Sequence, residues 1–314
     1  MNYLEFFHFD NHPFTNDGKM NYFYPKKSFL SIVDELIKLC RFESGIFTIV
    51  GNNGVGKTVI LNKVLDALNN NDFTISVNAD ERTEMLKVIA NKVNIDYRNI
   101  SDILIKLSNI YADGKNVVIA IDNAENLSKD EYISLNSLIQ VLPNLKVILC
   151  GKKTLYKKLN QTAIKPIKKH ILKKFKVRHF KIFSTMKYIS YIEKNALALS
   201  QYKKVFSFPA KFLISVITNR DINHINFIAE KSLINAFSRK KNKVCVKDVL
   251  KALKENFDII KDNVYYKLQK ILFYILLILS AYYAVKIIVD RNDLINHIEA
   301  QKSIRQQEKE LRNL

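Results

Sequence analysis

The eight residues from Gly51 to Thr58 read GNNGVGKT, and they constrain the fold more than any other part of the chain. They match the pattern G-x-x-x-x-G-K-[ST] and lie between a short apolar run, residues 45–50, and a segment with helical apolar spacing, residues 58–70. Glycines in such a loop let the backbone curl so that its N–H groups surround phosphate oxygens. The N-terminus of the following helix adds its dipole. The pattern therefore predicts a phosphate-binding loop.

This loop and the start of the next helix supply the residues that we expect to bind a nucleotide. Lys57 is expected to neutralise charge on the β- and γ-phosphates, which gives it a catalytic as well as a binding role. Thr58 is expected to ligate Mg²⁺ through its hydroxyl, so ATP and Mg²⁺ are the predicted cofactors. The predicted binding residues are Gly51, Asn52, Asn53, Gly54, Val55, Gly56, Lys57, Thr58 and Val59.

Short apolar runs alternate with helical periodicity over the first half of the chain. A sheet whose strands alternate with helices is parallel and is covered by helices on both faces. The sequence thus predicts an α/β fold of the P-loop NTPase class. The predicted strands are residues 45–50, 73–78, 116–121 and 145–150, and the predicted helices are residues 58–70, 81–93, 101–111 and 128–141.

The apolar run VVIAID, residues 117–122, is the natural partner strand of the loop. Asp122 at its end is expected to hold Mg²⁺ through water, opposite Thr58, although a core strand can also end in aspartate. The next residue, Asn123, occupies the position where many such ATPases have a glutamate that polarises the attacking water. An amide can orient water but cannot accept its proton. Glu125 is either a substitute base, if the chain turns there, or a surface carboxylate.

Three stretches together resemble the GspA/ExeA-like AAA+ ATPases. They are FFHFDNHPF followed by YFYP, the strand and loop GIFTIVGNNGVGKT, and AIDNAENL, where that family usually has a DEAQNL-type Walker B motif. The likeness continues through VILCGKKTLYKKL, the strand that carries sensor 1, and along a helical lid to about residue 255. The family consists of cytoplasmic-side ATPases of bacterial secretion and pilus systems, often with one transmembrane helix and a periplasmic peptidoglycan-binding region. The resemblance implies such a role for this chain.

The chain departs from the family pattern at the positions that matter for hydrolysis. Asn123 replaces the Walker B glutamate. An expected arginine is replaced by KKHI, residues 168–171, which leaves Lys168, Lys169 or His170 as substitutes. The lid has Ile-Asn pairs at residues 222–223 and 225–226 without the usual Pro-Arg ahead of them, and Arg220 is the nearest arginine. Because an arginine finger contributes on the order of 10³–10⁵ in rate, we expect ATP binding with slow or absent turnover.

The net charge of +20 is concentrated in one part of the chain. No acidic residue lies between Glu131 and Glu193, whereas residues 152–187 contain thirteen lysines and arginines. This block indicates either an anionic partner, nucleic acid or an acidic membrane surface, or a solvated basic face. The three cysteines are far apart, so the sequence predicts no disulfide framework and favours a reducing compartment.

Residues 271–289 read ILFYILLILSAYYAVKIIV, apolar on all sides with Lys286 as their one charge. At a rise of ~1.5 Å per residue they span about 28 Å, close to the ~30 Å hydrocarbon core of a bilayer. A buried core helix is the alternative, but core helices normally keep a polar stripe. We therefore expect a single-pass protein of the bacterial inner membrane, with the ATPase domain cytoplasmic and the short tail outside. The tail is too short for a wall-binding domain.

These observations divide the chain into five predicted parts and favour one function over two others. The favoured function is a membrane-anchored AAA+-type ATP-binding protein that organises a secretion, type IV pilus or DNA-uptake assembly. Its expected partners are further copies of itself and membrane or periplasmic assembly proteins, reached through the helix and the tail. The alternatives are a DNA-binding AAA+ ATPase like those of transposition target selection and a nucleotide-gated scaffold without hydrolysis. The predicted parts are an N-terminal segment packing on the ATPase core (residues 1–44), the ATPase core (45–160), a basic helical lid (161–260), the membrane helix (271–289) and the tail (290–314).

Overall fold

The computed structural model describes residues 2–14, 22–81, 83–162, 164–197 and 204–256, together with residues 280, 282, 283, 286 and 287. Residues Met1–Asn256 form one unit, and Phe257–Leu314 form a second. The candidate site lies in the first unit.

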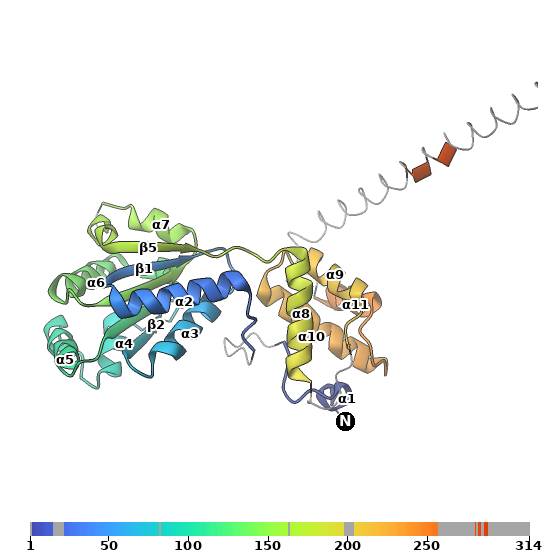
Figure 1. Ribbon diagram of the computed structural model, residues 1–314, viewed down its shortest axis with the longest axis horizontal. Helices are drawn as coiled ribbons and strands as arrows, with labels where there is room; N and C mark the ends of the chain where they lie inside the picture. The colour runs from blue at the N-terminus through green and yellow to red at the C-terminus, as the bar shows by residue number, and fades with distance from the viewer. Residues whose placement is uncertain are drawn as a thin grey trace, which may run out of the picture. The chain divides into compact units, whose positions relative to one another are not determined.

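A parallel sheet forms the centre of the first unit (Figure 1). Its strands in the described residues are β1 (Gly45–Val50), β2 (Phe73–Asn78), β3 (Val117–Asp122), β4 (Lys146–Gly151) and β5 (Ile171–Lys176), in the order β2-β3-β4-β1-β5. Strands β1, β3 and β4 are buried over their whole length, as expected for central strands covered on both faces. Because parallel strands end at the same edge, the residues that follow β1, β4 and β3 meet there.

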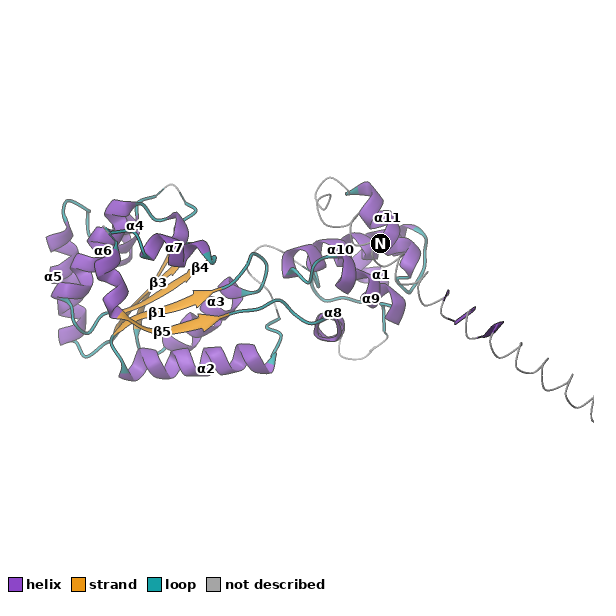
Figure 2. Ribbon diagram, turned by 90° about the horizontal axis from the view of Figure 1, so that it is seen from above, coloured by secondary structure: helices purple, strands orange, loops and turns teal. Residues whose placement is uncertain are grey.

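Helices cover both faces of this sheet, which confirms the predicted α/β class (Figure 2). One face carries α2 (Lys27–Phe42) and α3 (Lys57–Leu68). The other face packs on α4 (Met85–Lys92), α5 (Ile100–Ala112), α6 (Lys129–Val141) and α7 (Thr154–Leu159), which share one apolar core with the strands. The faces separate because successive side chains of a strand point to opposite sides. Ile46 lies in the α4–α7 core, whereas its neighbour Phe47 points to the other face.

Strand β5 was not predicted, and it moves the boundary of the core. The sequence prediction ended the core at residue 160 and assigned the following residues to the lid. In the structure β5 pairs with β1 in parallel, so the sheet continues to Lys176. Its lysines hide the strand pattern because it is an edge strand, where exposed charges discourage pairing with other chains.

A helical lid follows the sheet. It consists of α8 (Ile182–Ala196), α9 (Phe208–Ile217), α10 (Ile222–Ser238) and α11 (Val246–Glu255). Ser207 and Asp221 cap α9 and α10 by accepting hydrogen bonds from backbone N–H groups of the first turn. Helix α9 packs on α8, α10 and α11, and α10 also packs on α11.

The N-terminal segment is divided between lid and core, which corrects the prediction that all of residues 1–44 pack on the core. Helix α1 (Tyr3–Phe7) contacts α10, with Phe6 against Phe237. Phe14 packs edge-on against Phe206 before α9. Only the later part, α2, lies on the core against α3. Aromatic residues predict burial but not the surface that buries them.

Most of the predicted membrane helix, residues 271–289, and all of the tail, residues 290–314, lie outside the described residues. Within the described residues, no helix combines the length and the apolar character needed to cross a bilayer.

Candidate nucleotide-binding site

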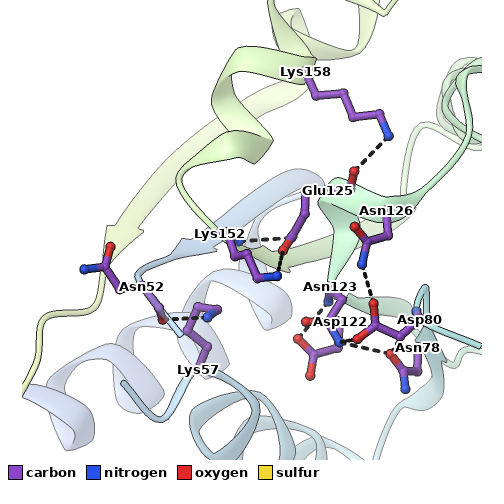
Figure 3. Close-up of polar contacts among 10 residues, drawn as sticks. All are labelled: Asn52, Lys57, Asn78, Asp80, Asp122, Asn123, Glu125, Asn126, Lys152 and Lys158. Atoms are coloured by element: carbon purple, nitrogen blue, oxygen red, sulfur yellow. Dashed lines mark hydrogen bonds and ion pairs between the residues drawn. The ribbon is translucent and has the colours of Figure 1, made fainter. Parts of the chain in front are cut away.

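The loop GNNGVGKT leaves β1 and leads directly into α3. Gly54 and Gly56 have φ angles of 59° and 91°, a left-handed conformation that glycine adopts without a steric cost, and Gly56 is the N-cap of α3. Lys57 is the first helical residue and is buried, and its Nζ donates to the carbonyl oxygen of Asn52 at 2.9 Å. The ammonium group therefore lies over its own loop (Figure 3). The side chain of Val55, in the same loop, is buried.

Thr58 and Asp122 meet across the sheet edge. The Thr58 hydroxyl donates to Asp122 Oδ2 at 2.6 Å, and the other carboxylate oxygen accepts the Asn123 backbone N–H at 2.9 Å. This contact joins the first turn of α3 to the end of β3. A hydroxyl and a carboxylate in contact beside a phosphate-binding loop are the oxygen ligands that Mg²⁺ prefers, so the residues present fit a Mg²⁺–ATP complex.

Asn123 turns away from the loop and towards β2. Its φ of 51° lies in the left-handed region, which asparagine tolerates better than most residues. Its side-chain amide donates to Asn78 Oδ1 at 3.1 Å and to Asp80 Oδ2 at 2.7 Å (Figure 3). The residue at the position of the usual glutamate is therefore held by two groups at the end of the neighbouring strand.

Glu125 lies in the short 3-10 helix η1 (Ala124–Asn126) and faces the end of β4. Its Oε2 accepts the backbone N–H of Lys152 at 3.0 Å, and its Oε1 lies 3.7 Å from Lys152 Nζ. A Cβ at Gly151 would collide with this carboxylate, so a larger residue there would displace the Glu125 side chain. Lys158 donates to the backbone oxygens of Glu125 and Leu127. The Glu125 side chain is buried and holds the β4–α7 turn, so it is not a surface carboxylate. Its role as a substitute base stays a prediction.

Cys150, the residue before Gly151 on β4, is buried among the charged groups of the site. Burial raises the pKa of its thiol well above the ordinary value, and the Asp122 carboxylate beside it raises the pKa further. The thiol thus stays neutral, and the sulfur adds no negative charge next to Asp122. The sequence showed this cysteine only as one of three scattered residues.

The lid reaches the loop through the start of α10. The Ile222 N–H donates to the carbonyl oxygen of Gly54 at 2.7 Å, and the Asp221 carboxylate packs so closely on Gly54 that a Cβ there would collide with it. His179, between β5 and α8, lies with Nε2 3.3 Å from Asn52 Nδ2 and with Nδ1 3.4 Å from the Arg220 carbonyl oxygen. Sequence reasoning missed these contacts because they join segments far apart in the chain.

The residues proposed to replace an arginine lie in two places. Lys168, Lys169 and His170 form the end of the 3-10 helix η2 (Lys165–His170), just before β5. Lys168 donates to Asn160 Oδ1 at 2.8 Å, and within the described residues none of the three forms a hydrogen bond or ion pair with the loop. Arg220 has a φ of 62° and immediately precedes the α10 N-cap, Asp221, which does touch the loop.

The parallel sheet, its strand order and the loop after β1 define an α/β domain of the P-loop NTPase type. Residues 40–159 match the family described as AAA domain. No curated protein sequence matches the chain.

The fold of this chain is similar to the folds of solved ORC and Cdc6 proteins. ORC2 of Aeropyrum pernix, solved in ADPNP–ADP complexes, is 15% identical with a TM-score of 0.64, over 79% of this chain and 72% of that one. Cdc6p of Pyrobaculum aerophilum is 17% identical with a TM-score of 0.63, over 78% and 71%. ORC1 of Aeropyrum pernix, solved in complex with DNA, is 14% identical with a TM-score of 0.62, over 77% and 68%. At these identities the likeness shows the fold alone, a parallel α/β sheet followed by a helical lid.

Proposed function

We propose that this protein is an ATP-binding AAA+ protein that uses nucleotide binding, with slow hydrolysis, to organise an assembly. The observation that carries the proposal is the Thr58–Asp122 contact at the phosphate-binding loop, next to an Asn123 amide that faces away from it. The first feature supports binding of Mg²⁺–ATP, with Lys57 and the loop backbone on the phosphates. The second supports slow turnover, because no carboxylate stands at position 123 to accept a proton from water.

The contact between lid and loop supports a nucleotide-dependent change in the lid. Gly54 binds the Ile222 N–H through its carbonyl oxygen and touches the Asp221 carboxylate. Phosphate groups on the loop would bring negative charge close to Asp221, and like charges repel. Bound ATP would therefore alter the contact at the start of α10. We propose that this change controls self-association of the chain, as a homo-oligomer.

The sequence supports a location of the protein in a membrane. Residues 271–289 have the length and composition of a membrane span, and the resemblance to GspA/ExeA-like ATPases implies a secretion, pilus or DNA-uptake assembly. We place the protein in the bacterial inner membrane with the AAA+ domain in the cytoplasm, where membrane or periplasmic proteins are its partners. Carbonate extraction of membranes checks this: release of the protein into the soluble fraction would exclude a spanning helix.

The first test compares assembly and turnover of the 314-residue chain with ATP, with ADP and without nucleotide. We expect ATP to increase the particle mass measured by light scattering, whereas phosphate release stays close to the protein-free rate. ADP should not have the same effect, because the response depends on the γ-phosphate. Rapid phosphate release by the wild type, abolished by Glu125→Gln, would contradict slow hydrolysis and would make Glu125 the base.

DNA binding is the second candidate, and the basic side chains of residues 152–187 favour it. Most of the lysines in α7, η2 and β5 are exposed, and among the described residues of this block ion pairs form at Lys152 with Glu125 and at Lys173 with Glu35. Lysines without an acidic partner attract the phosphates of DNA, and their binding releases the counterions that are condensed on the DNA.

A DNA mobility-shift titration at several salt concentrations tests this candidate. If the basic residues bind DNA, the logarithm of affinity should fall with the logarithm of salt at a slope of about −0.9 per phosphate contact. Lys168→Glu combined with Lys169→Glu should weaken binding and flatten the slope. Affinity that does not change with salt, or no binding with ATP present, would reject DNA as the partner.

A further inference from the structure

Two acceptor groups converge on the side chain at position 123. Asp80 Oδ2 lies 2.7 Å from Asn123 Nδ2, and Asn78 Oδ1 lies 3.1 Å from the same nitrogen. Asp80 also accepts a hydrogen bond from the side-chain amide of Asn126, through its other oxygen (Figure 3). Both hydrogens of the Asn123 amide are therefore used, and both go to oxygen.

The direction of these hydrogen bonds is fixed by chemistry. A carboxylate only accepts, so Asn123 must present its NH₂ group to Asp80. The Asn78 oxygen is held in place as well, because it also accepts the backbone N–H of Asp80 at 3.2 Å while the Asn78 amide faces Glu81 at 3.5 Å. A carboxylate at position 123 would have no proton to donate and would face a second carboxylate directly.

This arrangement is set by the strand register and not by chance packing. Strands β2 and β3 pair so that Asn78 stands opposite Asp122, which brings Asp80 beside Asn123 just beyond the strand ends. The Ala79 N–H donates to the Asp122 carbonyl oxygen at 3.0 Å and fixes that approach. Glu81 and Asn126, which flank the pair, line an open cleft of about 520 Å³, so water can reach this corner.

We propose that Asp80 is the positioning residue that admits an amide and excludes a carboxylate at position 123, and that it thereby keeps the site binding ATP without rapid hydrolysis. The second half of this inference rests on the proposed function, whereas the exclusion itself is a property of the fold. The carboxylate of this corner follows the end of β2, and the amide follows the end of β3. A glutamate at position 123 alone would be repelled by Asp80 from this corner, whereas a glutamate opposite an amide at position 80 would accept its hydrogen bond and stay turned away from the loop.

Four variants of the full chain test the pair: Asn123→Gln, Asn123→Glu, Asp80→Asn and the double exchange Asp80→Asn/Asn123→Glu. Gln and Glu have the same size and the same backbone strain at φ 51°, so they differ only in donor capacity and charge. Without nucleotide, we expect Asn123→Glu to melt about 3 °C or more below Asn123→Gln, and the double exchange to recover most of this loss. Equal melting temperatures for Asn123→Gln and Asn123→Glu would overturn the exclusion.

Phosphate release by the same variants tests the catalytic consequence. Asn123→Glu alone should release phosphate at least about tenfold faster than the wild type, whereas the double exchange, in which the amide at position 80 holds the glutamate away from the loop, should not. A double exchange that reaches the rate of Asn123→Glu alone would overturn the proposal, as would an Asn123→Glu variant that binds ATP but shows no gain. Failure of the wild type to bind ATP would refute the proposed function, and the melting temperatures would still decide whether Asp80 and Asn123 are coupled.

Discussion

The Lys57→Ala variant is expected to lose ATP binding while remaining folded. The Lys57 ammonium is buried at the start of α3, where its hydrogen bond to the Asn52 carbonyl holds it over the loop. Phosphates entering the loop would exchange this neutral acceptor for charged ones, which form stronger hydrogen bonds. Removal of the charge should weaken ATP binding about 100-fold, which corresponds to about 2.7 kcal/mol.

Titration with a fluorescent ATP analogue measures this loss, and the thermal unfolding midpoint without nucleotide shows whether the variant folds. Lys92→Ala is the matched control, because Lys92 is an exposed lysine in the last turn of α4. Its ATP affinity should equal that of the wild type. Undiminished binding by a folded Lys57→Ala variant would show that this loop is not the nucleotide site.

The features that the sequence predicted well are those whose signal is local. The loop from Gly51 to Thr58 carries its own geometry, since the glycines sit where the backbone turns into the left-handed region. Strand β3 was recognisable because a central strand is apolar throughout and ends in a single carboxylate, Asp122. The α/β class followed from the alternation of such strands with helices.

Strand β5 shows what a local pattern does not contain. Of its six residues Phe175 alone is fully buried, and its lysines made the segment look like part of a basic block. Its place in the sheet follows from pairing with β1, which is more than 100 residues earlier in the chain. The hydrogen bonds that connect distant segments are not visible in a local pattern, and edge strands depend on them most.

The neighbours of Asn123 were hidden for a related reason. The sequence shows that an asparagine replaces a glutamate, but its partners lie elsewhere in the chain, Asn78 at the end of β2 and Asp80 two residues beyond it. The parallel order of β2 and β3 and their register are both needed before Asp80 can be placed beside Asn123. The signal that the sequence offered for this contact was an aspartate, Asp80, two residues past the end of the predicted strand 73–78. Glu125 differs, because its burial against Lys152 depends on where β4 ends.

The Lys211→Met variant is expected to lose about 3–5 kcal/mol of unfolding free energy, because it leaves a buried carboxylate without its ion-pair partner. Lys211 Nζ lies 2.8 Å from Glu193 Oε2, and the Glu193 side chain is fully buried. Glu193 also accepts backbone N–H groups from Val205 and Phe206, so one carboxylate joins α8, α9 and the segment between them. Without Lys211 this carboxylate stays in the interior with no cation beside it.

Urea unfolding followed by far-ultraviolet circular dichroism measures the loss, with Lys187→Met as the control. Lys187 is exposed on α8 and should change the unfolding free energy by less than about 0.5 kcal/mol. Replacing both partners, Glu193→Leu with Lys211→Met, should recover much of the stability, since an apolar pair leaves no charge unpaired. Equal stability of Lys211→Met and Lys187→Met would show that the pair does not hold the lid together. Because α9 packs on α10, whose first residues touch Gly54, the same loss should weaken the contact between lid and loop.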